Sequence, residues 1–290
     1  DLHLSLRRQR QMCIRDSFIV LLASLMHAIW NGMVKNHPDK VIAISGIVYG
    51  RIPLSIIAII LLPLPSINSI PYIIGGVIIH QLYQLSLLNS YKIGDLTKVY
   101  PISRGSGPLV ATIISVLILG IVLDKVIIFS ICLICFGIIF LSLLDKSIQN
   151  QKTVRYSLLT GLCIGLYSII DGYGARLSPS AISFISWSFI INAILYPLVI
   201  KLIKEKDIFT RIKEKGKNIF FIGGTLDYLT YVIVVWSFTK APIPMVGALR
   251  ETSILFTMLI GYFFLKEKIT PIKIFSILMI LSGVVALKLL

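Results

Sequence analysis

Long runs of apolar residues, separated by short polar gaps, dominate the pattern of this chain. A window of the length that crosses a bilayer finds ten such runs, each roughly 18 to 24 residues long. They begin near Ser17, Val41, Tyr72, Val99, Lys125, Ser157, Ala181, Ile219, Val246 and Pro271. Because hydrocarbon holds no water to satisfy backbone groups, each run is predicted to be a helix. The predicted fold class is therefore an all-α membrane protein with ten transmembrane helices.

The composition supports a membrane protein rather than a soluble one. Hydrophobic residues make up 56% of the 290 residues and charged residues only 14%, whereas charged residues are about a quarter of a soluble domain. The net charge of +15 would suggest nucleic acid as the partner of a soluble chain. Here the lysines lie in the gaps between apolar runs, which is typical of membrane-protein loops. We therefore expect a lipid bilayer around the chain and no nucleic-acid partner.

Residues 1–16 differ from the rest, because they are polar and change abruptly into apolar sequence at Ser17. We expect these residues to be a non-native tail and exclude them from the fold. The alternative is a signal peptide, with three arginines before the apolar stretch 18–26. No small-residue cleavage site follows that stretch, because His27, Trp30 and Asn31 come next. The signal peptide is therefore disfavoured.

The chain matches itself when it is shifted by about half its length. A shift of 146 positions aligns two arginines, and shifts of 148 and 140 align further polar and small residues in the same order. The aligned pairs are Arg104 with Arg250, Ser130 with Ser276, Gly137 with Gly283, Gly75-Gly76 with Gly223-Gly224, and Asn31-Gly32 with Asp171-Gly172. We predict one repeat of five helices at residues 17–149, a linker at 150–156 and a second repeat of five helices at 157–290.

Five crossings in each repeat have a consequence for the architecture. Because five is odd, the second repeat enters the membrane from the side opposite to the first. Two inverted repeats of this kind give many secondary transporters their two access states. Arg104 and Arg250 hold equivalent places near the starts of the fourth and ninth runs. We therefore expect them to lie towards opposite faces of the membrane.

Three sequence motifs occur in a characteristic order. They are "HAIWNGMVK" (27–35), "GDLTKVYPISRGSGPL" (94–109) and "GALRETSILF" (247–256), the last followed by "LKE" (265–267). In this order they resemble the EamA branch of the drug/metabolite transporter superfamily, and the likeness covers essentially all of residues 17–290. The resemblance implies a ten-helix, two-repeat transporter of the bacterial cytoplasmic membrane that moves small metabolites or drugs, commonly outward. It implies no particular substrate.

One position departs from the family pattern. Family members often carry a glutamate after the fourth helix, whereas this chain reads "LGIVLDK" at 119–125. The second half keeps the acid as Glu267. Any role of that acid is therefore missing from the first repeat.

A small set of ionisable residues lies within the apolar runs. Charges in hydrocarbon are costly, so such residues are candidates for a solute or ion pathway. The set is Arg51, Arg104, Arg250, Asp171, Asp227 and Glu251. Three positive and three negative charges allow pairing inside the protein, although the sequence does not tell which residues meet.

Helix-breaking residues surround Arg104. Pro101 precedes it, and Gly105, Gly107 and Pro108 follow it, so we expect the helix to break or restart here. A restarted helix beside an arginine suits an anionic group such as a carboxylate. Alternatively, Arg104 extends to the lipid headgroups, because it lies only about 8 Å along the helix from Val99.

The second arginine and the acids have their own alternatives. Glu251 follows Arg250 directly, so a purely structural pair is as plausible as a role in the solute pathway. Asp171 is the best candidate for a proton carrier, because an acid that loads and releases a proton couples transport to the proton gradient. The alternative for Asp171 is pairing with an arginine.

Polar stripes follow helical spacing on several apolar runs. His27 and Asn31 share a face of the first run, where we favour hydrogen bonds between helices over a role in a cavity. Further stripes suit the wall of a substrate cavity, and they consist of His80, Tyr83 and Gln84 in the third run and Asp227 and Tyr231 in the eighth. Gly161 and Gly165 form a GxxxG pattern, which predicts close packing of helices.

The function classes can be ordered from these observations. The chain contains no HExxH, no GxSxG and no phosphate-binding loop, so we predict no catalytic residue, metal or cofactor. A secondary transporter for a small solute is favoured, working outward by alternating access, with protons as a candidate coupling ion. A flippase for lipids or lipid-linked intermediates and a membrane-embedded enzyme are the alternatives. A second copy of the chain, forming a homodimer, is a further candidate partner.

The positive charges also bear on orientation. Gaps after odd-numbered runs carry seventeen Lys and Arg residues, and gaps after even-numbered runs carry three. The positive-inside rule then puts both termini outside the cell. The family resemblance implies both termini inside, so the two arguments disagree and the orientation stays open.

Overall fold

The structure is a computed structural model that describes residues 2–93, 96–143, 151–265 and 271–288, and all its regular elements in these ranges are helical. The helices are α1 (Leu2–Asn36), α2 (Lys40–Gly50), α3 (Ile52–Leu61), α4 (Ile70–Ile93), α5 (Leu96–Ile113), α6 (Lys125–Leu143), α7 (Gln151–Leu177), α8 (Ala181–Leu202), α9 (Ile208–Lys215), α10 (Gly224–Phe238), α11 (Ile243–Arg250), α12 (Ser253–Leu265) and α13 (Pro271–Lys288). A 3₁₀ turn lies at Ile67–Ser69, and π-helical turns lie at Ile114–Ile118 and Ile219–Gly223.

Six described helical segments are long and apolar enough to cross a membrane. They are Phe18–Asn36, Lys40–Leu61, Ile67–Ser90, Gln151–Leu177, Ala181–Leu202 and Ile219–Phe238. Three shorter apolar helical segments lie at Ile102–Ile118, Lys125–Phe140 and Ile274–Leu287. These segments coincide with nine of the ten predicted runs, and α11 and α12 divide the remaining one. The described part of the chain is therefore all-helical, and the protein is a multi-pass membrane protein.

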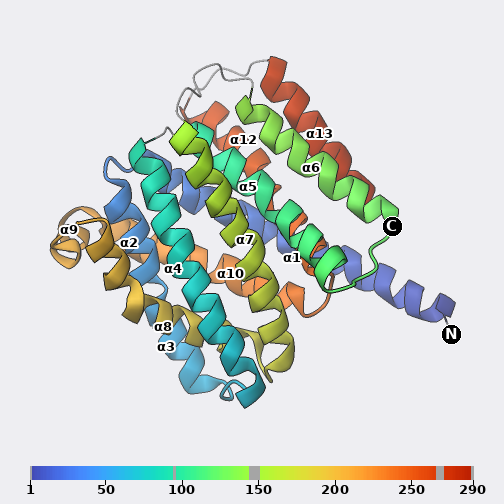
Figure 1. Cartoon of the computed structure of the whole chain (residues 1–290), viewed down its shortest axis with the longest axis horizontal. Coiled ribbons are helices and arrows are strands. Elements are labelled where there is room, and N and C mark those ends of the chain that lie inside the picture. The colour runs from blue at the N-terminus through green and yellow to red at the C-terminus, as the bar shows by residue number, and fades with distance from the viewer. Residues whose placement is uncertain (1, 94–95, 144–150, 266–270, 289–290) are drawn as a thin grey trace.

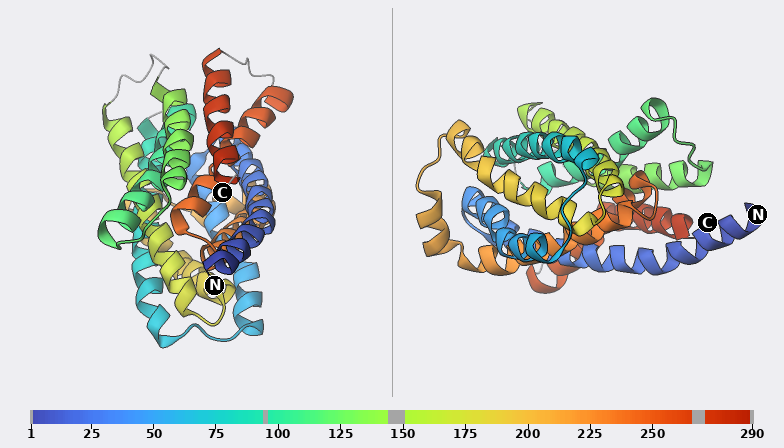
Figure 2. Two further views of the ribbon diagram at one scale, coloured as in Figure 1. Left: turned by 90° about the vertical axis from the view of Figure 1, so that its right-hand side faces the viewer. Right: turned by 90° about the horizontal axis from the view of Figure 1, so that it is seen from below.

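The helices pack in pairs that join the two halves of the chain. Helix α4 packs along α7, and α1 packs along α10. Helices α6 and α13 lie side by side at one end of the molecule in Figure 1, and α3 and α8 lie together at the opposite end. Figure 2 shows that the first turns of α1 project beyond the bundle. Helices from the two halves therefore interleave and do not form two separate bodies.

The outside of the bundle is apolar, as a lipid-facing surface must be. Large apolar side chains are strongly exposed there, among them Ile60, Leu61, Leu117, Val122 and Phe263. Polar and charged side chains are buried between the helices instead. This inverts the pattern of a soluble protein and fits hydrocarbon as the solvent.

The predicted helix break around Arg104 is wrong. Helix α5 continues unbroken from Leu96 to Ile113, through all four residues that were expected to interrupt it. The helix tolerates Pro101, Gly105, Gly107 and Pro108 because tertiary packing overrides their weak propensity. A Cβ added to Gly105 would lie 2.7 Å from Ile139 of α6, and one added to Gly107 would lie 2.5 Å from Ile164 of α7. The glycines therefore allow close helix contact and do not bend the backbone.

The GxxxG pattern of α7 serves the same contact. A Cβ on Gly161 would lie 2.9 Å from the carbonyl oxygen of Ser103, and one on Gly165 would lie 2.9 Å from that of Gly107. Both carbonyls belong to α5, so the backbones of α5 and α7 approach each other directly. The prediction of close packing at this pattern is confirmed.

Gly50 lies at a still closer contact, and replacing it with alanine is expected to destabilise the fold. The added Cβ would lie 2.1 Å from the carbonyl oxygen of Phe220 and 3.0 Å from the Cα of Gly224. Because both atoms belong to the backbone, a whole helix must move, and we expect a loss of about 1–3 kcal/mol. The matched control is Gly32→Ala, since nothing lies within 4 Å of a Cβ at that position. Thermal unfolding in detergent measures both, and equal melting temperatures would contradict the packing argument.

Candidate functional site

Four side chains predicted as site residues meet inside the bundle. The Nε atom of Arg104 lies 2.8 Å from Oε2 of Glu251, and Nη2 of Arg250 lies 3.3 Å from Oε1 of the same carboxylate. Nη2 of Arg104 also lies 2.6 Å from Nε2 of His27. The exposed fractions are 4% for Arg104, 2% for Arg250, 0% for Glu251 and 7% for His27, so bulk water does not screen these charges. We call these four residues the central charge cluster.

The expectation that Arg104 and Arg250 lie towards opposite faces is wrong for their side chains, because both guanidinium groups reach one carboxylate. Arg104 lies eight residues after the start of α5, and Arg250 lies seven residues after the start of α11. At 1.5 Å per residue each Cα is therefore about 10–12 Å along its helix, far enough for the long side chains to meet.

The helix is interrupted at Glu251, which supplies the carboxylate of this cluster. Helix α11 ends at Arg250, α12 begins at Ser253, and Glu251 and Thr252 form the turn between them. The backbone N–H of Glu251 donates to the carbonyl of Ala248, and that of Thr252 donates to the carbonyl of Leu249. The interruption expected in α5 therefore occurs at the equivalent place in the second half. Interrupted helices of this kind form solute and ion sites in transporters.

The charge of the cluster follows from hydrogen-bond chemistry. A guanidinium group has donors but no acceptor, so Nε2 of His27 must accept the bond from Arg104. His27 is therefore neutral in this arrangement, with its proton on Nδ1. Among the described residues of the cluster, two guanidinium groups then face one carboxylate, which leaves one positive charge in excess.

A second polar site surrounds Asp171 of α7. Its Oδ2 atom accepts a hydrogen bond of 2.6 Å from the hydroxyl of Tyr231 and lies 2.9 Å from Nε2 of His80. Its Oδ1 atom is buried and has no hydrogen-bond partner among the described residues. The alternative that Asp171 pairs with an arginine is wrong, because its contacts are a histidine and a tyrosine. We call these three residues the Asp171 site.

Aromatic rings connect the two sites. The ring of Tyr167 stacks on His80 with centroids 4.2 Å apart, and the ring of Tyr83 meets Tyr167 edge-on at 5.6 Å. Tyr83 also lines a small cavity, together with His27, Arg104 and residues of α7. That cavity has a volume of about 30 Å³, which is room for a water molecule but not for an organic solute. The structure is therefore closed around the site.

The remaining predicted residues form contacts of their own. Asp227 pairs with Arg51 across α10 and the junction of α2 and α3. Nε2 of Gln84 donates to Oδ1 of Asn192 at 2.9 Å. Asn31 lines the cavity, but its amide donates to the carbonyl of His27 in the same helix, 2.7 Å away. Hydrogen bonding between helices is therefore observed for His27 and not for Asn31.

Sequence reasoning missed several residues of the site. Asn192 was overlooked, although an amide within the apolar run "SWSFIINAILY" is a signal that could have been read. Arg51 was counted among the buried charges but was given no partner or role, although Pro53 lies near the junction where α2 ends and α3 begins. Ser103 and Thr160 line the cavity and carried no sequence signal that sets them apart. Small hydroxyl residues are common in membrane helices for packing alone.

The sequence places an acid after the fourth predicted helix, Asp124, and another after the ninth, Glu267. Asp124, in the "LGIVLDK" segment, is exposed, and its carboxylate accepts the N–H of Val126 at the start of α6. This is an ordinary cap of a helix N-terminus. Glu267 lies outside the described residues. Within the described ranges, no group of three or more His, Cys, Asp or Glu side chains could hold a metal ion.

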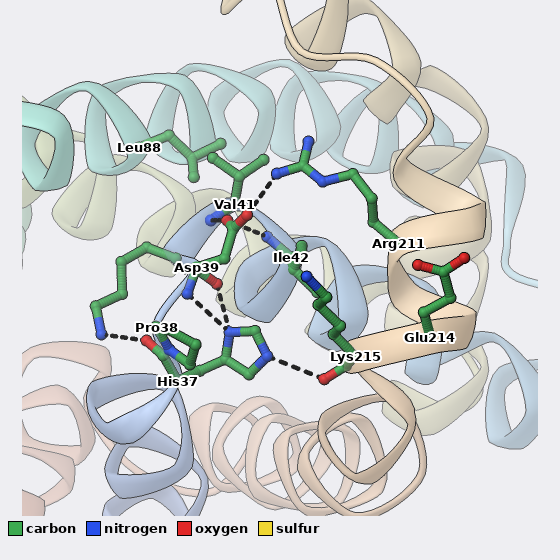
Figure 3. Close-up of a pocket in the computed structure, with 10 residues that line it drawn as sticks. His37, Pro38, Asp39, Val41, Ile42, Leu88, Arg211, Glu214 and Lys215 are labelled. Atoms are coloured by element: carbon green, nitrogen blue, oxygen red, sulfur yellow. Dashed lines mark hydrogen bonds and ion pairs between the residues drawn. The ribbon is translucent and has the colours of Figure 1, made fainter.

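A larger cavity lies at one end of the bundle, where the turn between α1 and α2 meets α4 and α9 (Figure 3). Its volume is about 570 Å³, and Asp39, Arg211, Leu88 and Lys215 are among its lining residues. Asp39 caps α2 and pairs with Arg211 of α9, while Nε2 of His37 donates to the carbonyl of Lys215. These bonds fasten the α1–α2 turn to the second half of the chain.

The Asp39 carboxylate is stabilised in its charged form. Burial alone would raise the pKa of Asp39, but the backbone N–H groups of Ile42 and Val41 and the guanidinium of Arg211 outweigh burial and hold this pKa below its usual value. The ion pair between Asp39 and Arg211 of α9 therefore persists at neutral pH. It weakens only as the pH falls through the depressed pKa of Asp39 and the carboxylate is protonated.

Comparison with known proteins relates the second half of the chain to a family of transporters. The sequence pattern of the EamA-like transporter family matches residues 151–289. A solved structure described only as "Crystal structure of protein" aligns with a TM-score of 0.71 at 13% identity, covering 95% of this chain and 96% of that one. Twenty-six chains of solved structures match. Comparison with curated proteins gives no match.

The fold and the buried charges define a multi-pass helical membrane protein with a polar interior. The sequence of residues 151–289 matches the EamA-like transporter family, and this family belongs to the drug/metabolite transporter superfamily. The likeness to the solved structure extends over nearly the whole chain and concerns the fold alone.

Proposed function

We propose that this chain is a secondary transporter of the bacterial cytoplasmic membrane. It moves a small metabolite or drug-like solute outward by alternating access, and protons drive it. The transporter family of residues 151–289 supports this class and argues against an enzyme. The single observation that carries the proposal is the burial of the central charge cluster and the Asp171 site inside apolar helices from both halves.

The contacts between helices support two inverted repeats of five spans. If the first and sixth spans are counterparts, and likewise the third and eighth, a two-fold repeat requires that α4 on α7 be matched by α1 on α10. Both contacts exist. The contact of α5 with α7 is likewise matched by those of α1 with α11 and α12. Counterparts α3 and α8 meet each other, as do α6 and α13. Five spans in each repeat then imply opposite orientations.

The location of the charges supports alternating access. Arg104 comes from the first half, while Arg250 and Glu251 come from the second, so the ion pair of Arg104 with Glu251 spans the two proposed repeats. Such a pair has to break or shift when one repeat moves against the other. The cavity beside it is too small for a solute, which fits an occluded state between the two open ones.

Flux in proteoliposomes tests the proposal. The purified chain is reconstituted with an imposed pH gradient, a pH-sensitive dye reports proton movement, and pools of small metabolites and drug-like solutes are added. We expect at least one pool to cause proton flux that a protonophore abolishes. In Arg104→Gln, which breaks the pair between the proposed repeats, we expect the flux to fall about tenfold or more with unchanged membrane insertion.

The controls separate this function from its alternatives. Empty liposomes must show no response, and Lys213→Gln on the exposed face of α9 should behave like the wild type. A lipid flippase would instead move labelled lipid between leaflets and ignore soluble pools. If no soluble pool causes gradient-dependent flux, the transporter proposal fails.

A further inference from the structure

The central charge cluster also bears on the class of solute, an inference that rests on the proposed transport function. We propose that the solute is a small monocarboxylate with an apolar body, whose carboxylate docks on Arg104 while Glu251 transfers to Arg250. Glu251 is then a resident carboxylate that holds the place of the solute in the closed state. Four observations lead to this proposal.

The first observation is the imbalance of charge. Two buried guanidinium groups share one carboxylate, and the neighbouring His27 is neutral because it accepts a bond from Arg104. An excess cation surrounded by apolar helices is unfavourable. One added monoanion converts the cluster into two balanced pairs, with the solute on Arg104 and Glu251 on Arg250. A neutral solute leaves the excess charge, and a dianion reverses it.

The second observation is the geometry at Arg250. Both of its contacts, 3.4 Å from Nε and 3.3 Å from Nη2, end on the single oxygen Oε1 of Glu251. A guanidinium fork matches both oxygens of a carboxylate, but Oε2 lies against Arg104 instead. The carboxylate is thus divided between two arginines. When the solute takes over Arg104, Glu251 gains a two-oxygen contact with Arg250.

The third observation is the place of Glu251 in the chain. It lies in the turn between α11 and α12, where two residues separate the helices. A residue in such an interruption can change its backbone direction without unwinding a whole helix. The repeat shift that aligns Arg104 with Arg250 places Glu251 on Gly105. The cluster therefore has two equivalent arginines but only one acid, which is why the acid must alternate between them.

The fourth observation concerns the body of the solute. The small cavity is lined by Arg104 and His27. Most of the remaining lining is aromatic or aliphatic, although Asn31, Ser103 and Thr160 also contribute; the apolar members are Trp30, Val34, Ile44, Tyr83, Leu87 and Ile164. Such walls favour an apolar group behind the carboxylate. The cavity must widen to admit it, as alternating access requires.

Binding can be measured without knowing the natural solute. The probes are benzoate, phenylacetate and 4-methylpentanoate, each compared with its own neutral amide. A ligand that binds the folded state raises the apparent melting temperature as its concentration increases. For the wild type in detergent we expect this rise with at least one carboxylate and with none of the amides. No rise with any carboxylate, or an equal rise with an amide, would overturn the proposal.

Variants test the transfer of Glu251. In Arg250→Gln, Glu251 has no second partner and stays on Arg104, so we expect carboxylate binding to weaken about tenfold or more. Adding Glu251→Gln to that variant removes the competing carboxylate and restores the excess charge. We therefore expect the double variant to bind within about threefold of the wild type. A purely structural cluster predicts the reverse, with the double variant worse than the single one.

The matched control is the other double variant, Arg104→Gln with Glu251→Gln. It has the same net charge but lacks the docking arginine, so we expect no recovery of binding. Recovery of carboxylate binding in both double variants, or in neither, would contradict the assignment of Arg104 as the docking group. Size-exclusion profiles confirm that each variant is folded before binding is measured.

The outcome is separable from that of the proposed function. Gradient-driven flux of some solute without any carboxylate binding would leave the transporter intact and remove this inference. Carboxylate binding without gradient-driven flux of the bound compound would support the docking site and contradict the proton-driven transporter.

Discussion

Replacing Glu251 with glutamine is expected to lower the free energy of unfolding by about 3–5 kcal/mol, the range for removing one partner of a buried ion pair. The variant leaves two guanidinium groups, 4% and 2% exposed, next to a neutral amide. Their separation is short enough for both to contact one carboxylate, so they also repel each other once that carboxylate is gone. Water does not reach them to offset the cost.

Thermal unfolding in detergent at neutral pH, without added anions, measures this effect. Arg250→Gln is the informative comparison, because it leaves a balanced pair of Arg104 and Glu251 and should be nearly neutral in stability. Glu214→Gln on the exposed face of α9 makes the same chemical change at the surface, and we expect it to stay within about 0.5 kcal/mol of the wild type. If Glu251→Gln had the same melting temperature as Glu214→Gln, Glu251 would not stabilise the cluster by balancing its charge.

Much of the fold could be predicted from the sequence, because apolar runs of bilayer length have only one way to satisfy their backbone in hydrocarbon. Helices α6, α8 and α13 begin at the expected positions Lys125, Ala181 and Pro271, and the π-helical turn that leads into α10 begins at the expected Ile219. The GxxxG contact at Gly161 was also predictable, since small residues at this spacing permit close approach. These predictions depend on local pattern alone.

The places where the helices break could not be predicted from local pattern. Proline and glycine around Arg104 suggested an interruption that does not exist, because α6 and α7 pack into the space that the glycines leave. The real interruption at Glu251 has no glycine or proline within three residues on either side. Its cause lies in tertiary contacts, which a single sequence does not contain.

The composition of the site was predicted better than its pairing. Charges within apolar runs are expected to be buried, which makes them candidates for functional residues. This reasoning correctly predicted an interior position for Arg104, Arg250, Glu251 and Asp171. Which of them meet depends on the crossing of helices far apart in sequence. The equivalent places of the two arginines in inverted repeats suggested opposite faces of the membrane, but their long side chains reach the same carboxylate.

For the proton-driven transport proposed above, Asp171→Asn is expected to abolish coupling to the proton gradient while leaving solute exchange largely intact. Asparagine has nearly the same shape as aspartate but does not titrate. The carboxylate is fully buried, holds Tyr231 and His80 on one oxygen, and has no hydrogen-bond partner among the described residues on the other. That second oxygen offers a place for a proton. The aromatic contacts through Tyr167 and Tyr83 give the site a route to the cavity beside Arg104.

Two assays on one set of proteoliposomes separate coupling from structure. The first measures accumulation of the transported solute against its gradient when a pH gradient is imposed. The second measures exchange of labelled for unlabelled solute at equal pH, which needs no net proton movement. Asp171→Asn should lose accumulation about tenfold or more and keep exchange within about threefold. Asp227→Asn removes a different buried acid, the partner of Arg51, and should keep the pH dependence of whatever transport it retains. Loss of accumulation and exchange together in Asp171→Asn would make that residue a structural one, and unchanged accumulation would remove it as the proton carrier.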